Sequence, residues 1–503
     1  MIAKGVALLI VTALIGGCTA QADFSSSPPA ISSPTLRPSE MPLSSPSPTP
    51  TPSATPPPPL DEAALAEALP QVTLDVELFY AERWMRVRQA VEIRNTSSEA
   101  WDEVVFQVPI NYIPDAFYLD ALTVTLGEMV QEGTSPLIGN GTVLRVPLPR
   151  AALPGEMLHI DMRYRVVIPP LPKTDWPPLG TTGWTPDLIQ AGEWYPALVP
   201  YVEGEGWRMW RYHPVGDPTV YPLTDCTLIV HTEPEITVVS GGAQEQDEAG
   251  AWHFHLERAR GVAFLASDRY EVATDEANGV AVASYYLPEH AAAGEAVLEI
   301  ATQAIALFEE LYGPYPYQSL TVAENGFFGG MEYTALATVT DYAYLIYPGE
   351  APSLLHALVS HEVAHQWWYG AVGNDQVYEP WLDEALAFYS ELLYFERYHS
   401  EATDWWWEER VYQYSPSGPV DATIYSYSDS RRFILSMYGQ AAQFMRDLRA
   451  LMGDEAFFAF LRDYYEAFRW RMVSADDFFA AVRRHTEADL SPLLAVYFAN
   501  TEH

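Results

Sequence analysis

Cysteine and lysine are almost absent from this chain of 503 residues. Its cysteines are Cys18 and Cys226, and its lysines are Lys4 and Lys173. Cys18 belongs to an N-terminal targeting segment, so no disulfide framework can form in the remainder of the chain. Nothing in the sequence around Cys226 would lower the pKa of its thiol, and we therefore expect a buried, inert side chain near the start of a strand.

Positive charge is also scarce. The chain has 27 lysine and arginine residues against 67 aspartate and glutamate residues, which gives a formal net charge of −40. A chain with this balance repels nucleic acids and anionic lipid surfaces, so we expect no nucleic-acid partner. Because 49% of the residues are hydrophobic, the chain can bury the cores of two or three domains.

The apolar run at the N-terminus is too short to cross a bilayer, which takes about 20 residues. Residues 1–17 carry one positive charge, Lys4, followed by this run, a pattern that is typical of a signal peptide. The run ends in LIGGC, which resembles a bacterial lipobox, and the resemblance implies that Cys18 becomes the lipidated first residue of the mature chain. The alternative is an ordinary secretory signal in which the cysteine is incidental.

Residues 18–60 consist mainly of proline, serine, threonine and alanine. This composition cannot bury a core, so we expect an extended linker with a reach on the order of 100 Å. A lipid on Cys18 followed by such a linker would hold a folded domain at the bacterial cell surface or on the periplasmic side of a membrane. The expected membrane contact is a lipid anchor and not a membrane-spanning helix.

Two folded parts are expected after the linker. Residues 61–272 alternate between apolar and polar side chains over many short segments, and this period of two predicts an antiparallel β domain with one buried face. The pattern changes in residues 273–503, where we predict a strand over 280–287 and a long amphipathic helix over 291–311. Further helical segments follow toward the C-terminus, so the predicted fold class is α+β.

The segment HEVAH at 361–365 lies in an apolar run without glycine or proline to interrupt a helix. Residues four apart share one face of a helix, so His361 and His365 can direct their imidazoles at a single point. Two neutral imidazoles at this spacing suit Zn²⁺, and a catalytic zinc site needs one further protein ligand and a water. Glu384 in the next helical segment offers the carboxylate, and Glu362 is placed to act as a general base without binding the metal.

An HExxH motif followed by a glutamate inside WLDEALA resembles the gluzincin metallopeptidases, specifically the M1 aminopeptidase family. Residues 329–333, GGMEY, are similar to the GAMEN motif of that family. Tyr438 lies where the family has a YxKG segment, although Gln440 and Ala441 replace its lysine and glycine. The resemblance implies an N-terminal β domain followed by a thermolysin-like catalytic domain with a helical C-terminal lobe, and it covers residues 61–503.

The resemblance also implies roles for individual residues. Glu332, the glutamate of the GAMEN-like segment, would pair with the free α-ammonium of a peptide in a charge-assisted hydrogen bond. Gly329, Gly330 and Met331 belong to the strand on which the family binds the peptide, and glycine permits a close approach of the backbone. Tyr438 would donate a hydrogen bond to the oxyanion that develops in the transition state.

Two assignments stay open at the level of sequence. Tyr425 and Tyr427 precede Tyr438 and compete with it for the role of oxyanion donor. The family adds a second residue from the β domain that binds the substrate amine, and Gln190 and Glu193 are both candidates for it.

Together these residues predict a Zn²⁺-dependent aminopeptidase that acts on peptides. One alternative is a gluzincin endopeptidase or non-peptide hydrolase that uses the same metal site. Another is an inactive, zinc-bearing surface protein that binds peptides, although such a protein would have no use for the general base Glu362. The residue preference at the first substrate position, the physiological substrate and the oligomeric state stay undetermined.

Overall fold

The computed structural model describes residues 55–133, 137–138, 141–171, 181–217, 219–327 and 329–502. The described residues belong to one compact unit. The predicted signal peptide, Cys18 and most of the predicted linker lie outside the described residues.

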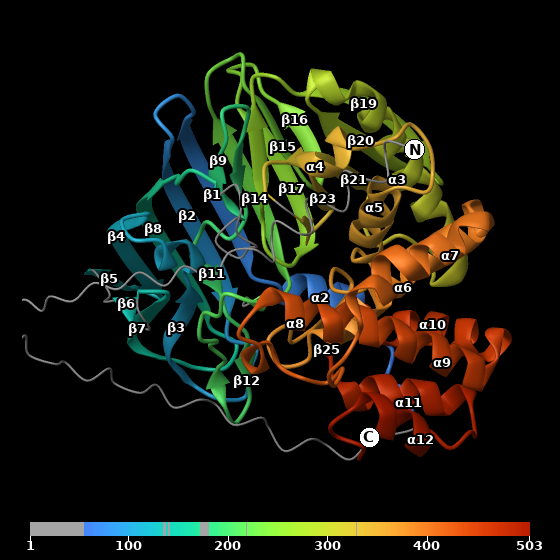
Figure 1. Cartoon of the computed structure of the whole chain (residues 1–503). Coiled ribbons are helices and arrows are strands. Elements are labelled where there is room, and N and C mark those ends of the chain that lie inside the picture. Colours follow the sequence, from blue (N-terminus) through green and yellow to red (C-terminus); the bar gives the residue numbers. More distant parts are fainter. Residues whose placement is uncertain are drawn as a thin grey trace, which may run out of the picture. The chain divides into compact units, whose positions relative to one another are not determined.

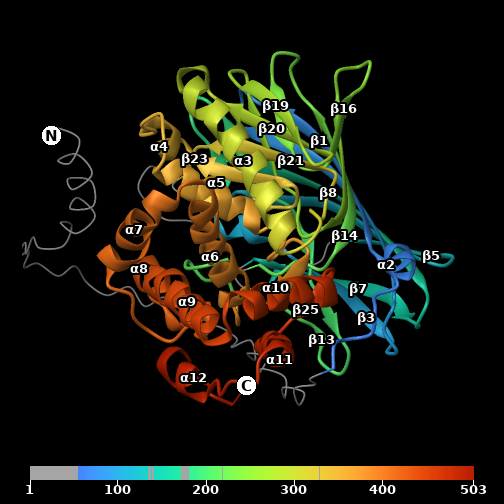
Figure 2. The ribbon, with the colours of Figure 1, turned by 90° about the vertical axis from the view of Figure 1, so that its right-hand side faces the viewer.

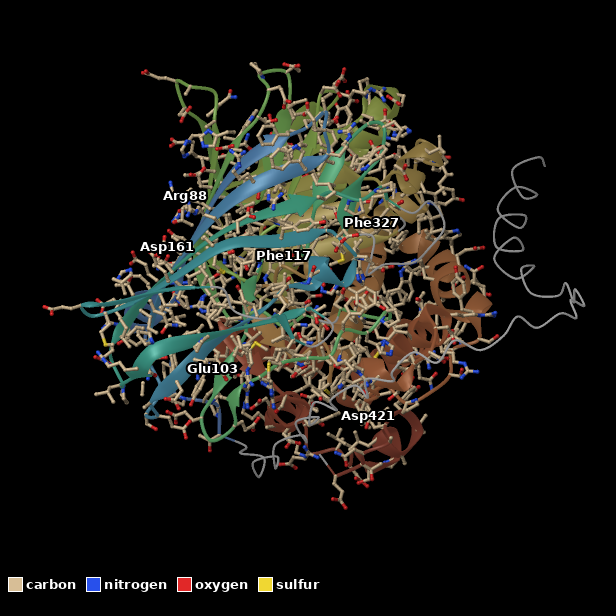
Figure 3. All side chains as sticks on the ribbon, turned by 90° about the vertical axis from the view of Figure 1, so that its left-hand side faces the viewer. Arg88, Glu103, Phe117, Asp161, Phe327 and Asp421 are labelled. Carbon is tan, nitrogen blue, oxygen red and sulfur yellow. The ribbon has the colours of Figure 1, made fainter. Side chains whose placement is uncertain are left out.

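An eight-stranded sheet is the largest element of the N-terminal half (Figure 1). In β8 (Met157–Val167), every second residue from Leu158 to Val166 is buried, because apolar and polar side chains alternate strictly along this strand. Figure 3 labels Arg88 and Asp161, two exposed side chains of β2 and β8. In order across the sheet the strands are β16 (Ala243–Gln246), β17 (Trp252–Ala259), β14 (Thr224–His231), β1 (Gln71–Phe79), β2 (Trp84–Arg94), β8, β4 (Phe117–Leu126) and β5 (Met129–Gly133).

One strand pair of this sheet departs from the predicted antiparallel arrangement. β1 pairs with β14 in parallel, while its other neighbour, β2, is antiparallel to it. A parallel pair needs a long crossover connection, and the chain from β2 to β13 supplies it here. The remaining pairs of the sheet are antiparallel, as predicted.

Smaller elements complete the N-terminal half. One four-stranded sheet consists of β15 (Thr237–Ser240), β18 (Phe264–Ser267), β10 (Ile189–Ala191) and β9 (Thr182–Trp184), and another of β11 (Ala197–Leu198), β3 (Trp101–Gln107), β7 (Val143–Ala152) and β6 (Leu137–Ile138). The short strands β12 (Tyr201–Val202) and β13 (Gly206–Trp207) form a hairpin. Helix α2 (Glu62–Ala68) precedes β1, and a 3₁₀ turn covers Pro109–Tyr112.

A five-stranded sheet opens the C-terminal half, in the order β19 (Glu271–Ala277), β20 (Val280–Tyr286), β21 (Ser319–Asn325), β23 (Leu336–Thr340) and β22 (Gly330–Tyr333). The domain boundary expected at 272/273 falls inside β19. The helix predicted over 291–311 is α3 (Ala291–Leu311). Its length and composition would allow it to cross a membrane, but it buries Val297, Ile300 and Ala304 and packs against β19, β20 and α5 (Figure 2).

Helices form most of the remaining chain, in the orange and red parts of Figure 1. The α-helices are α4 (Asp341–Leu345), α5 (Leu354–Ala364), α6 (Trp381–Tyr398), α7 (Thr403–Trp406), α8 (Ser430–Ile434), α9 (Ala441–Met452), α10 (Asp454–Phe468), α11 (Ala475–His485) and α12 (Ser491–Tyr497). Two π-helical segments cover Trp407–Val411 and Leu435–Gln440, and β24 (Val372–Asn374) pairs in parallel with β25 (Arg471–Val473). One hydrophobic core joins these helices to the five-stranded sheet, and a second lies within the β domain.

Candidate metal centre

Helix α5 carries the HExxH segment and begins at a well-formed cap. The Ser353 side chain accepts a hydrogen bond from the backbone N–H of His356, which satisfies one of the free donors at the helix start. His361 and His365 lie one turn apart at the C-terminal end of this helix, and both are buried. Their Nε2 atoms are 3.0 Å apart, so the two imidazoles converge as the spacing predicts.

Glu384 in the first turn of α6 completes the cluster. Its Oε2 atom lies 3.3 Å from His361 Nε2 and 3.6 Å from His365 Nε2. Two imidazole nitrogens and one carboxylate oxygen that converge in a buried space form a donor set that fits a divalent zinc ion. The other nitrogen of His365, Nδ1, lies 3.0 Å from the carbonyl oxygen of Trp368, and this hydrogen bond leaves Nε2 free to accept the ion.

The electrostatics of these ligands favour a cation at the centre of the cluster. Burial alone would lower the pKa of His361, but the carboxylates of Glu384 and Glu391 raise it to about 9. Burial alone would raise the pKa of Glu384, yet the two imidazoles lower it far below its ordinary value. The carboxylates around the two imidazoles thus favour a positive charge in this space, and a metal ion would supply that charge once the imidazoles have lost their protons.

Glu391 is a functional residue that the sequence analysis missed. It lies two turns after Glu384 on α6 and is fully buried, with Oε1 3.1 Å from His361 Nδ1. Arg410 in the first π-helical segment donates to both of its carboxylate oxygens, at 2.8 and 2.9 Å, and Trp406 donates through Nε1 at 2.9 Å. The spacing of seven residues along one helix face was the signal in the sequence that could have revealed Glu391.

Glu362 and Gly330 are brought into direct contact. Glu362 is buried, burial raises its pKa to about 8, and its Oε2 has no hydrogen-bond partner among the described residues. A Cβ atom added to Gly330 would lie 2.8 Å from Glu362 Cγ and would overlap its carboxylate. Gly330 therefore makes room for the candidate general base, and Gly329 before it adopts a φ of +134°, which favours glycine.

Glu332 faces the same space from β22, the edge strand of the five-stranded sheet. It pairs in register with Ala337 of β23, whereas Met331 pairs with Thr338. Glu332 is buried, and ligand atoms of Glu332, Glu362 and His365 all lie within 4.8 Å of one another. The predicted amine-binding carboxylate and the predicted general base thus lie side by side next to a metal ligand.

Tyr438 lies in the second π-helical segment, a distortion that is often found at functional sites. Its hydroxyl donates a hydrogen bond of 2.6 Å to Glu384 Oε1, and its ring stacks on the His361 imidazole at 5.9 Å. The competing tyrosines lie elsewhere: the Tyr425 hydroxyl bonds to the backbone of Arg211, and the Tyr427 ring packs on Phe433.

The two candidates for a second amine-binding residue occupy different places. The Gln190 side chain accepts a hydrogen bond of 3.2 Å from the backbone N–H of Gly326. Burial, together with the nearby charge of Glu332, raises the pKa of Glu193 to about 7. Asp217 is a carboxylate that the sequence analysis did not find: burial raises its pKa, as do the charges of Glu332 and other carboxylates of the site.

Cys226 is the free cysteine within the described residues, and it lies buried in β14. Burial raises the pKa of its thiol well above the ordinary range. The expectation of a buried thiol is therefore confirmed, and its environment disfavours the reactive thiolate.

The candidate site lies in a part of the chain that matches a known family model. Residues 296–497 match the model of the Peptidase family M1 domain. Aminopeptidase N of Lactobacillus delbrueckii subsp. lactis is 27% identical over 284 residues, which are 51% of this chain and 33% of that protein. Aminopeptidase N of Lactobacillus helveticus is 26% identical over 284 residues, which are 52% of this chain and 32% of that protein. The match thus spans about a third of each curated relative.

Solved structures share the fold over most of the chain. The crystal structure of the M1 zinc metallopeptidase from Deinococcus radiodurans aligns with a TM-score of 0.61 at 19% identity and covers 86% of this chain and 93% of that one. A mutant of that protein bound to a Tyr-Ser-Ala substrate aligns with a TM-score of 0.60 at 20% identity, over 85% of this chain and 93% of that one.

Proposed function

We propose that this protein is a zinc-dependent aminopeptidase that removes N-terminal residues from peptides. The observation that carries the proposal is that His365 belongs to two clusters of potential ligand atoms. Its ligand atom clusters within 4.8 Å with those of His361 and Glu384, and again with those of Glu332 and Glu362. A ligand set for a metal, a general base and a carboxylate for the substrate amine therefore share one buried space.

His361, His365 and Glu384 would hold the ion. When bound, zinc supplies Lewis-acid chemistry that activates a water and polarises a carbonyl group. Glu362 accepts the proton of the attacking water and passes it to the leaving amine. This role is supported by its buried Oε2, which has no hydrogen-bond partner among the described residues.

Glu332 and Tyr438 would act on the substrate itself. Glu332 pairs with the free α-ammonium, so the chain end is fixed at a set distance from the scissile bond. Tyr438 turns its hydroxyl from Glu384 toward the oxyanion as charge develops there. Glu193, whose pKa responds to the charge of Glu332, is the better supported candidate for the second amine-binding residue, because Gln190 bonds to the backbone of Gly326.

Hydrolysis of fluorogenic aminoacyl amides tests the proposal, with free and N-acetylated substrates compared on the purified protein. We expect cleavage of the free-amine substrates alone, and its loss in Glu362→Gln. Cleavage of blocked peptides would identify an endopeptidase instead. A zinc-loaded protein that cleaves neither substrate would be a peptide-binding protein.

We further propose that the protein is a bacterial lipoprotein that is anchored through Cys18 and acts outside the cytoplasmic membrane. The support is in the sequence: an apolar leader that ends in LIGGC, followed by a linker rich in proline and serine up to residue 60. Cells fed a clickable fatty-acid analogue should label the protein but not Cys18→Ser, and the variant should leave the membrane fraction. Equal labelling of both proteins would refute the anchor.

A further inference from the structure

Gln376 lies between two carboxylates of the site and contacts both. It follows β24 in the turn that leads into α6, and its side chain is buried. Its Nε2 donates one hydrogen bond of 3.2 Å to Glu332 Oε1 and another of 2.9 Å to Asp383 Oδ2. Both amide hydrogens of one side chain are therefore used to hold acidic groups.

The far end of this bridge is fixed to the metal ligand. Asp383 directly precedes Glu384, and its Oδ1 accepts a hydrogen bond of 2.9 Å from the Glu384 backbone N–H. Asn374 donates to the same oxygen at 3.0 Å. A continuous chain of hydrogen bonds thus runs from the start of α6 through Asp383 and Gln376 to Glu332.

The turn that carries Gln376 is also held in place. Asp375 Oδ1 accepts hydrogen bonds of 3.1 Å from the backbone N–H groups of Val377 and Tyr378, a local pattern that fixes the backbone of a turn. Trp210 of the β domain donates to the same oxygen at 3.1 Å. The Gln376 backbone is therefore held from both halves of the described chain.

We propose that Gln376 is a positioning residue for the substrate amine: it fixes Glu332 through one carboxylate oxygen and leaves the other oxygen for the α-ammonium. This inference rests on the proposed aminopeptidase function. Within the described part of the chain, the hydrogen bond that Glu332 accepts from Gln376 lies at Oε1 and not at Oε2. Only a neutral donor suits this position, because a cation there would neutralise Glu332 and compete with the substrate for it.

The experiment removes the bridge and measures what the amine contributes to binding. Gln376→Met keeps the size of the side chain and deletes both hydrogen bonds, while Gln376→Lys keeps a donor and adds a positive charge. Leucine hydroxamate and 4-methylpentanohydroxamate bind the metal through the same group and differ in the α-amine. Their affinities for the zinc-loaded protein are measured by calorimetry, and the KM and kcat for a leucyl fluorogenic amide are measured beside them.

We expect Gln376→Met to lower the affinity for leucine hydroxamate on the order of tenfold, since a hydrogen bond to a charged group is lost. The affinity for 4-methylpentanohydroxamate should not change, and KM should rise more than kcat falls. Gln376→Lys should lower the affinity for leucine hydroxamate further. This variant should still fold normally, because the lysine charge compensates two buried carboxylates. Gln246→Met in the exposed strand β16 is the matched control and should behave as the wild type.

The outcomes separate this inference from the proposed function. If wild-type protein binds both hydroxamates equally, the amine is not recognised and the aminopeptidase proposal itself fails. If the wild type prefers the amine and Gln376→Met keeps that preference in full, the role of Gln376 is refuted. Equal weakening of both hydroxamates, or loss of zinc, would show that Gln376 is merely structural and would refute it as well.

Discussion

Gly330 and Glu362 lie against each other: because Gly330 on β22 has no side chain, there is room for the carboxylate of the candidate general base. A Cβ at position 330 would lie 2.8 Å from Glu362 Cγ and would overlap the carboxylate. We expect Gly330→Ala to displace the Glu362 carboxylate and to lower kcat/KM by about 100-fold, the order of loss caused by a small misplacement of a catalytic group. Zinc content and melting temperature should stay near those of the wild type.

Gly133→Ala is the control for the Gly330 substitution. Gly133 ends β5, and an added Cβ would meet no atom within 4 Å. This variant should retain wild-type kinetics, which would show that an extra methyl group in a strand is harmless where space exists. Full activity of Gly330→Ala would contradict the proposed role of Glu362, because a general base that has been displaced should not support full activity.

Tyr438 and Glu384 are joined by a hydrogen bond of 2.6 Å, which places the tyrosine hydroxyl beside the proposed metal. We expect Tyr438→Phe to lower kcat by about 100- to 1,000-fold, as is typical when one oxyanion donor is removed. KM and zinc content should change little. Steady-state kinetics and metal analysis on the same preparation measure all three quantities.

Tyr425→Phe provides the comparison, since Tyr425 bonds to the backbone of Arg211 and not to a metal ligand. Its kcat should stay close to that of the wild type. The reverse result, with a large loss in Tyr425→Phe and a small one in Tyr438→Phe, would transfer the role to the other tyrosine.

The convergence of the two histidines was predictable because it follows from local geometry. A spacing of four residues in an uninterrupted helical run is enough to place His361 and His365 together, and the long helix over 291–311 followed from its apolar period alone. The alternation in β8 likewise predicted which face of its strand is buried. In each case the deciding interaction lies within one element of secondary structure.

The residues that support the site were not predictable in this way. Arg410 meets Glu391 only because a π-helical segment packs against α6, and the charges of the site's carboxylates raise the pKa of Asp217, which is distant from them in the chain. The parallel pairing of β1 with β14 joins strands that are distant in the chain. Such contacts depend on tertiary packing, which hydrophobic periodicity along the sequence does not reveal.

Glu391 should control zinc affinity although it lies outside the ligand set. Its Oε1 is 3.1 Å from His361 Nδ1, so it orients the imidazole and increases its basicity. We expect Glu391→Gln to raise the zinc dissociation constant by about 10- to 100-fold, as measured by competition with a chromophoric chelator. Loss of charge opposite the buried Arg410 should also lower the melting temperature.

Glu396→Gln is the control for Glu391→Gln. Glu396 also lies on α6, and this substitution removes its ion pair with Arg449, at 2.8 Å. The variant should bind zinc as the wild type does, because the ion pair of Glu396 and Arg449 does not involve His361. If both variants lose zinc affinity equally, the effect arises from a weakened α6 and not from the support of His361.

Glu324 on β21 should make stability depend on pH. The side chain is fully buried: its Oε2 accepts a hydrogen bond of 2.9 Å from the backbone N–H of Leu287, and its Oε1 lies 2.8 Å from His290 Nδ1. Burial raises its pKa from 4.5 to about 7. The folded state therefore keeps a proton that the unfolded chain has already released at intermediate pH.

The sign of the effect follows from this proton balance. Because the folded state binds more protons between pH 4.5 and 7, the contribution of Glu324 is complete below pH 4.5 and is lost as the pH rises through 7. The glutamine of Glu324→Gln cannot titrate. Between pH 5 and pH 8, the free energy of unfolding of the wild type should therefore fall by about 2–3 kcal/mol relative to that of Glu324→Gln. Urea unfolding at several pH values measures this difference, with Glu248→Gln in an exposed turn as the control. Parallel pH profiles for wild type and Glu324→Gln would mean that Glu324 is ionised in the folded protein over this pH range, and would contradict the prediction.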